Sequence, residues 1–289
     1  MSNLQLFIAA VAIWGSTWLA ITFQLGKVAP EASVFYRFLF ASVLVFAYCF
    51  ARKLPLRYTL KQHLWVALMG VLMFSVSYIL VYYAEQHVVS GLVAVGYSAS
   101  PMLGLIGMRV FFGTPMTRLL VVGSILGMVG IALVFWPEFA RLQGDRKTAL
   151  GAMYTITAVV VSALGSIVAQ RNSRAGQPLW QSLAWGMLYG ATFSLGFTLA
   201  AGQPLAFEAT MPYVLSLVYL AVLGSILAFA AYLTLLHRVG AARAGYIGVM
   251  VPIVALVISA AFEGFRWHAL TWLGIAVSVA GNVIVLRRR

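Results

Sequence analysis

The sequence predicts an all-α integral membrane protein with ten membrane-spanning helices, and three observations lead to this fold class. First, 63% of the 289 residues are hydrophobic and only 9% are charged, whereas a soluble domain carries about 25% charged residues. Second, the apolar residues form runs of about 20 residues, the length that a helix needs to cross a bilayer. Third, the order of small residues repeats at an offset of about 150 positions.

Apolar runs of this length define the expected helices. We place the spans at residues 4–24, 32–51, 63–84, 88–108, 118–136, 148–170, 180–201, 212–236, 242–262 and 269–286. Helices are favoured over a β-barrel because barrel strands are about 10 residues long and alternate in polarity. A helix also satisfies its own backbone hydrogen bonds in lipid. The first run lacks the basic leader of a signal peptide, so we expect it to be retained.

The charged residues predict the orientation of these spans. With the N-terminus in the cytoplasm, 13 of the 19 basic residues fall on the cytoplasmic side. They are Arg52, Lys53, Arg57, Lys61, Arg109, Arg118, Arg171, Arg174, Arg238, Arg243, Arg287, Arg288 and Arg289. All six acidic residues fall on the opposite side. This bias is the one that the positive-inside rule describes, and it predicts that both termini are cytoplasmic.

An internal repeat predicts how the spans are organised. At an offset of 151, Pro101 falls on Pro252 and Gly113 falls on Gly264. We therefore expect two five-helix repeats, one over residues 1–140 and one over residues 148–289. Because five is an odd number of crossings, the repeats would enter the membrane from opposite sides, an arrangement that places a substrate site between them in many secondary transporters.

The first three spans contain five of the cavity candidates. Trp14 in the first span lies too deep to be an interfacial anchor. It therefore contacts lipid, packs inside the protein or lines a pathway. Thr17 lies about one helical turn further along the same span. In the third span Phe74, Tyr78 and Tyr82 share one helix face. That face could stack a flat solute in a cavity, or pack against neighbouring helices. Trp14, Thr17 and the three aromatic residues are our cavity candidates from these spans.

Arg37 is the basic residue that lies clearly inside a span. A charge within the membrane is a functional-site hypothesis by default. Its side chain could instead extend toward the outer interface, or pair with Glu31, Glu85 or Glu263. We expect Arg37, Glu85 and Glu263 to form a gate or a charge pair. Glu85 and His87 flank the outer end of the third span, where such residues are more often solvated.

The remaining spans contribute seven more cavity candidates. In the fourth and ninth spans we expect the prolines to loosen the helix ladder beside the cavity. Ser166 belongs to a polar stripe in the sixth span that could line the cavity or form interhelical hydrogen bonds. Phe229 in the eighth span falls on Tyr78 at the repeat offset. The cavity candidates from these spans are Tyr97, Pro101, Ser166, Trp185, Phe229, Tyr246 and Pro252.

Small residues at helical spacing predict close helix packing. Gly123 and Gly127 form such a pair in the fifth span, Gly186 and Gly190 form one in the seventh, and Gly274 begins a third in the tenth. These faces could pack within the monomer or between the protomers of a homodimer.

These patterns together resemble the drug/metabolite transporter superfamily, in its ten-helix EamA-domain form. The resemblance covers essentially the whole chain and rests on four features: "WGSTW" in the first span, "FYRFLFASV" in the second, the proline-centred fourth and ninth spans, and "FEGFRWHALTWLGIAVSVAGNVIV" at the end. It is closest to bacterial exporters of aromatic amino acids and related metabolites. Family repeats often carry an acid before the fifth helix; here Glu263 occupies that position in the second half, but Phe112 occupies it in the first.

The resemblance implies an inner-membrane secondary transporter that exports small metabolites, foremost aromatic or neutral amino acids, by alternating access. A passive channel, or a carrier of a different metabolite or a drug, is the alternative. The sequence contains no phosphate-binding loop, metal-ligand spacing or nucleophile–base pair, so we expect neither an enzyme nor a cofactor or metal. The net charge of +13 indicates contact with anionic lipid rather than nucleic acid, because the basic residues lie in short loops between spans.

Overall fold

Long apolar helices make up most of the chain, as the sequence predicts. The computed structural model describes residues 1–113, 118–141, 146–232, 234–235, 238 and 246–286, and it contains no strand within those ranges. The first part of the chain forms α1 (Asn3–Thr22), α2 (Pro30–Ala51), α3 (Leu60–Val71), η1 (Leu72–Val76), α4 (Ser77–Glu85), α5 (Ser90–Tyr97), α6 (Ser100–Phe112) and α7 (Arg118–Arg141). The second part forms α8 (Arg146–Arg174), α9 (Leu179–Ala200), α10 (Met211–Tyr219), η2 (Leu220–Leu227), α12 (Tyr246–Phe262) and α13 (Ala269–Leu286).

Seven helical segments in the described ranges are long and apolar enough to cross a membrane. They are Asn3–Thr22, Pro30–Ala51, Leu60–Glu85, Ser90–Phe112, Arg146–Arg174, Leu179–Ala200 and Met211–Tyr232. Three shorter apolar helices, Val121–Val134, Met250–Phe262 and Ala269–Gly281, coincide with the remaining expected spans. The prediction of long apolar helices is therefore confirmed, and the ten-span arrangement remains a proposal.

Local sequence determines where several helices begin and end. Ser2 and Thr59 each accept a hydrogen bond from the backbone of a glutamine three residues later, whose side chain bonds back to the cap residue. Gly113 and Gly264 follow the ends of α6 and α12 with φ angles of 66° and 71°. This left-handed conformation favours glycine, so both positions of this repeated pair end a helix in the same way.

The two repeated prolines have different effects on their helices. The fourth predicted span is divided at Ser98 and Ala99, and Pro101 is the second residue of α6. Proline is tolerated in the first turn of a helix and disfavours helical geometry in the residue before it. Pro252, by contrast, lies inside α12 without interrupting it. From the sequence, we expect both prolines to weaken the backbone hydrogen bonding of their helices. The helix is interrupted just before Pro101, whereas α12 continues through Pro252.

The third apolar run of each repeat contains a π-helical segment. η1 covers Leu72–Val76, and the corresponding positions at an offset of 151, Leu223–Leu227, lie within η2. A π-helical turn is rare and occurs frequently at functional sites. Both segments contact α2, and η2 also contacts α1, so the two irregular turns lie in the middle of the bundle.

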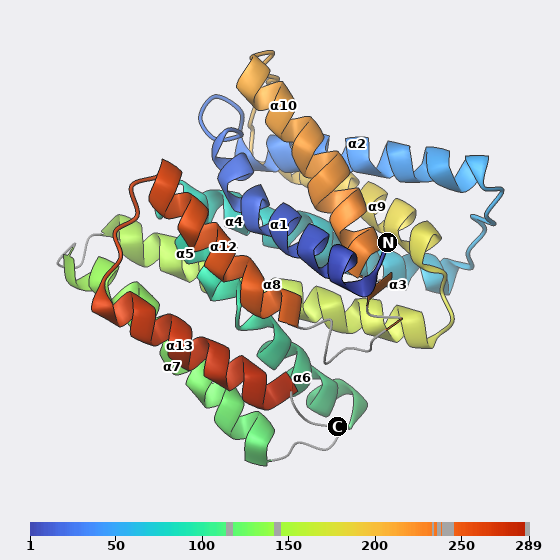
Figure 1. Ribbon diagram of the computed structural model, residues 1–289. Coiled ribbons are helices and arrows are strands. Elements are labelled where there is room, and N and C mark those ends of the chain that lie inside the picture. The colour runs from blue at the N-terminus through green and yellow to red at the C-terminus, as the bar shows by residue number, and fades with distance from the viewer. Residues whose placement is uncertain (114–117, 142–145, 233, 236–237, 239–245, 287–289) are drawn as a thin grey trace.

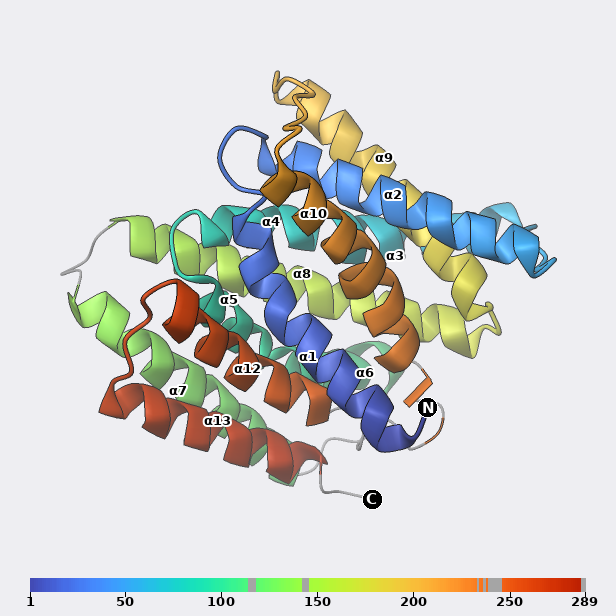
Figure 2. The same ribbon diagram turned by 45° about the horizontal axis from the view of Figure 1, so that its top comes forward.

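The helices pack together as one bundle (Figures 1 and 2). α7 and α13 lie side by side at one end of the bundle, and α2 and α9 pair at the other. α1 lies between them and contacts α12, α5 and η2. The start of α1 and the end of α13 lie toward the same end of the helices in both views.

Glycines allow the paired helices to approach closely. A Cβ atom at Gly130 would lie 2.5 Å from the backbone nitrogen of Ser278, and one at Gly70 would meet the backbone of Gly186. The glycines predicted to form packing faces, Gly123, Gly127, Gly186, Gly190 and Gly274, make such contacts or are buried within the chain. These faces are therefore occupied inside the monomer, and a homodimer would need a different surface.

The outer surface of the bundle is apolar, whereas its interior holds small and polar side chains. Large hydrophobic residues such as Ile156, Phe197 and Val257 are exposed, while Ser42, Ser75 and Ser194 are buried and hydrogen-bonded. Polar side chains in a membrane protein face the bundle interior because lipid cannot hydrogen-bond to them. This distribution is that of a protein surrounded by lipid.

Candidate functional site

Arg37 lies at the centre of the candidate site. It follows Pro30 by about two turns of α2, and its side chain is only 1% exposed. Its Nε donates to Ser225 Oγ at 3.2 Å, and Ser225 Oγ in turn donates to the Leu220 carbonyl at 3.0 Å within η2. Its Nη1 has no hydrogen-bond partner. The structure thus buries this charge between α2 and η2 and leaves one end of the guanidinium unbonded.

Aromatic rings surround the guanidinium. Its Cζ lies 4.4 Å from the centroid of the Tyr78 ring and 5.2 Å from that of Phe38, distances at which cation–π attraction operates. The aromatic cluster, defined here as Trp14, Phe38, Phe74, Tyr78 and Phe229, is linked through ring pairs with centroids 4.9–5.8 Å apart. Four of these five residues were cavity candidates, and they come from four different elements, so tertiary packing gathers them around Arg37.

A glycine lets α1 and η2 meet beside this cluster. Trp14 Nε1 donates to the Gly224 carbonyl at 3.1 Å. A Cβ atom at Gly224 would lie 2.8 Å from Thr17 Cγ2 and 3.5 Å from Arg37 Nη2. Thr17 is itself buried and donates to the Trp14 carbonyl at 2.8 Å. Both α1 candidates therefore lie against Gly224, the residue that also approaches the guanidinium.

Tyr82 and Glu85 continue the same helix face toward the end of α4. Tyr82 is 0% exposed, and its hydroxyl lies near the guanidinium without a hydrogen bond of ordinary geometry. Glu85 is 8% exposed, and neither carboxylate oxygen has a hydrogen-bond partner. The side chain interacts electrostatically with Arg37 and Glu263. The alternative that Glu85 is a solvated residue at the end of a span does not hold, because the fold buries it, and its role in a gate or charge pair remains a proposal.

No carboxylate in the described residues forms an ion pair with the buried guanidinium of Arg37. Within the described ranges, the one ion pair joins Lys27 Nζ and Glu208 Oε1 at 3.3 Å. Glu31 accepts a hydrogen bond from Tyr83 at 3.0 Å. Glu263 accepts hydrogen bonds from both the backbone nitrogen and the hydroxyl of Ser90, at the start of α5. A carboxylate is stabilised at a helix N-terminus, so Glu263 joins the two halves of the chain and does not contact Arg37.

The other predicted residues take part in different contacts. Tyr97 packs against Trp18 with ring centroids 5.1 Å apart, next to the cluster. Trp185 packs between Phe46 and His63 and donates to the Leu56 carbonyl at 3.1 Å, a separate group formed by α2, α3 and α9. Ser166 donates to the Ser162 carbonyl of its own helix at 3.0 Å.

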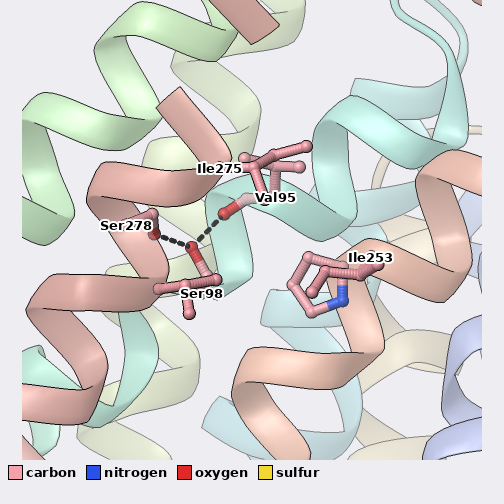
Figure 3. A pocket seen from close by; sticks show the side chains of 7 residues that line it. Val95, Ser98, Ile253, Ile275 and Ser278 are labelled. Atoms are coloured by element: carbon pink, nitrogen blue, oxygen red, sulfur yellow. Dashed lines mark hydrogen bonds between the residues drawn. The ribbon is translucent and has the colours of Figure 1, made fainter. Parts of the chain in front are cut away.

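Pro252 lines a small cavity between α5, α12 and α13. Figure 3 shows Val95 of α5, and Ser98 directly after α5, facing Ile253, Ile275 and Ser278. Ser98 donates to the Val95 carbonyl at 2.7 Å. The cavity volume is about 20 Å³, which is room for about one water molecule. It is too small for a solute. The side chains of Pro101 and Tyr246, also predicted to line the site, lie outside the described residues.

Three residues of the site were not predicted. Phe38 directly follows Arg37, and Ser225 and Gly224 lie in an apolar run. A lone serine in such a run must face protein or water, so Ser225 could have been found by the argument that identified Ser166. Phe38 and Gly224 carry no comparable signal, because phenylalanine and glycine are common throughout membrane helices.

The buried charge, the aromatic cluster and the lipid-facing exterior together describe a polytopic membrane protein with an internal polar site. The sequence profile of the EamA-like transporter family matches residues 1–136 and again residues 149–287. The chain therefore belongs to the EamA-like transporter family.

Named relatives agree with this assignment. The chain is 30% identical over 287 residues to YedA of Escherichia coli strain K12, described as an uncharacterized inner membrane transporter, with 96% of this chain and 88% of that protein covered. It is 22% identical to the uncharacterized transporter YoaV of Bacillus subtilis strain 168, covering 96% and 90%. A solved crystal structure of 17% identity covers 98% of this chain and 96% of its own at a TM-score of 0.71, which shows a shared fold. The protein is thus a multi-pass transporter of the inner membrane.

Proposed function

We propose that this transporter exports small metabolites, foremost aromatic and neutral amino acids, by alternating access between two inverted five-helix halves. The halves are residues 1–140 and 148–289. The site lies where the first half meets η2. Its proposed contacts are Trp14, Thr17, Phe74, Tyr78 and Phe229, with Arg37 as the charged group. The outward direction follows from the resemblance to exporters.

Several features support two inverted halves. The family profile matches the chain twice. A π-helical segment and a glycine with positive φ recur at the same offset. The start of α1 and the end of α13 lie toward the same end of the bundle (Figure 1), as an even number of crossings requires.

The single observation that carries the substrate proposal is the environment of Arg37. The guanidinium is buried, stacked on Tyr78 and unpaired by any carboxylate in the described part of the chain. A buried charge without a counter-ion is unfavourable. A solute carboxylate would neutralise it through charge-assisted hydrogen bonds, and an attached flat or apolar group would pack on the aromatic cluster. Aromatic and neutral amino acids combine both features.

The same site is closed in this conformation. Arg37 is 1% exposed, and Phe74 and Tyr82 are 0% exposed, so a solute cannot reach the guanidinium without separation of α1, α2 or α4 from η2. The hydrogen bond from Arg37 to Ser225 joins two of these elements. We infer that opening breaks this bond and that substrate replaces it. A channel would not require this exchange.

Flux through purified protein tests the proposal. Proteoliposomes are loaded with labelled L-phenylalanine, L-leucine or L-lysine, and efflux is measured with and without the protein. We expect saturable, protein-dependent efflux of L-phenylalanine and L-leucine, and acceleration by unlabelled substrate on the opposite side. Efflux that neither saturates nor accelerates would indicate a passive channel, and no protein-dependent efflux of any of the three would contradict the proposed substrate class.

A further inference from the structure

Three residues of α2 and α4 carry buried polar atoms that have no hydrogen-bond partner. Arg37 Nη1, Tyr82 Oη and both carboxylate oxygens of Glu85 are buried and have no hydrogen-bond partner. Buried polar atoms are nearly always hydrogen-bonded, so each exception requires an explanation. These atoms belong to a guanidinium, a hydroxyl and a carboxyl group, and the three groups interact electrostatically with one another.

The charged groups do not satisfy each other. No ion pair joins Arg37 to Glu85 in the described structure, although the two side chains interact electrostatically. The remaining ionisable groups near Glu85 are Glu263, which is held by Ser90, and Tyr97 of α5. Among the other elements packed on α4, α1 and η1 contain no ionisable side chain, and Tyr154 of α8 stacks on Tyr83 and His87.

The site therefore offers a guanidinium and a carboxyl group, each with buried polar atoms that have no hydrogen-bond partner. A ligand with a carboxylate alone would leave the Glu85 oxygens without a partner, and an amine alone would leave Arg37 Nη1 without one. A molecule that carries both charges a few bonds apart satisfies both groups and adds no net charge to the buried site. Burial makes this matching important because unpaired charges are costly in a low-dielectric interior.

We propose that Arg37, Tyr82 and Glu85 form a head-group site for a zwitterionic α-amino acid, in which Arg37 binds the carboxylate and Glu85 binds the ammonium group. Tyr82, which interacts electrostatically with both residues, donates a hydrogen bond from its hydroxyl to the carboxylate. The aromatic cluster receives the side chain of the ligand. This inference rests on the proposed transport function and adds to it the residues that require both charges of the substrate.

The experiment compares three ligands that share one ring. L-phenylalanine carries both charges, 3-phenylpropionate carries the carboxylate alone, and phenethylamine carries the ammonium group alone. Efflux from proteoliposomes and thermal stabilisation of the purified protein are measured for the wild type and for Glu85→Gln. Glu31→Gln is the matched control, because Glu31 is a buried acid whose carboxylate accepts a hydrogen bond that an amide oxygen can also accept.

We expect L-phenylalanine to be exported by the wild type, and to stabilise it, at concentrations at least about tenfold lower than either analogue requires. This factor is the one expected from the loss of one charged hydrogen bond. Glu85→Gln should lose about tenfold in L-phenylalanine efflux and stabilisation while 3-phenylpropionate is unaffected, and Glu31→Gln should behave as the wild type. Equal handling of L-phenylalanine and 3-phenylpropionate by the wild type would overturn the head-group site and leave the transport function intact.

Two further outcomes are informative. If Glu85→Gln keeps the ligand preference but loses the response of efflux to an imposed pH gradient, Glu85 carries protons and the head-group assignment is wrong. If the wild type neither moves nor is stabilised by any of the three ligands, while a compound outside the amino acids is exported, the proposed substrate class and the head-group site are both overturned.

Discussion

At the scale of single residues, the environment of Arg37 is the basis of the proposed substrate class. Its guanidinium is held by one hydrogen bond and one aromatic face and keeps a free donor. A lysine at this position would keep the charge but lose the planar group that stacks on Tyr78 and the Nε donor that reaches Ser225. The substitution therefore separates the role of charge from the role of shape.

We predict that Arg37→Lys lowers L-phenylalanine efflux by about 5- to 150-fold, because two directed contacts worth about 1–3 kcal/mol together are lost. The measurement is efflux from proteoliposomes at several substrate concentrations, with Arg52→Lys at the exposed end of α2 as the control. Efflux within about twofold of the wild type would show that a positive charge alone suffices and that stacking is irrelevant.

At the scale of helices, close packing of α7 on α13 fixes one end of the bundle. Gly130 faces the backbone of α13, and Gly281 faces the backbone of α7, with Cβ positions 2.5 Å from main-chain atoms. Backbone atoms cannot move aside as a flexible side chain can, so even a methyl group forces the helices apart. The π-helical segments η1 and η2, in contrast, interrupt the regular α-helical geometry beside the candidate site.

We predict that Gly130→Ala lowers the free energy of unfolding by about 1–3 kcal/mol through this overpacking. Gly104→Ala is the matched control, because no atom lies within 4 Å of a Cβ at that position, and it should leave stability unchanged or raise it by up to about 1 kcal/mol. Thermal unfolding of the two detergent-solubilised variants measures the difference. Equal midpoints would mean that α7 and α13 are not in this contact in the purified protein.

At the scale of the whole molecule, the arrangement in the membrane follows from the distribution of charge. Basic residues concentrate on one side of the predicted spans and acids on the other. The rule behind this bias acts during insertion, so it predicts topology without reference to packing. The arrangement of α1 and α13 in the bundle is compatible with termini on a common face (Figure 2).

We predict that both termini face the cytoplasm. Cys49 is buried, so a Cys49→Ala background allows labelling of single introduced cysteines. In intact cells an impermeant maleimide should fail to label Asn3→Cys or a cysteine added after Arg289, and it should label Gln203→Cys, which lies in an exposed loop on the predicted outer side. Labelling of only one of the two terminal cysteines would require an odd number of spans and contradict the inverted repeat.

The sequence by itself determined the class of fold, because hydrophobic length and charge bias are properties that each segment carries independently. It also identified Arg37, Tyr78 and Phe229, since a charge or a spaced set of aromatic residues in an apolar run is unusual wherever it packs. Only the tertiary structure decided that Glu85 is buried, that Glu263 binds Ser90, and that Trp185 lies apart from Trp14. Those outcomes depend on which helices become neighbours, and long-range packing is not encoded in the periodicity of any one span.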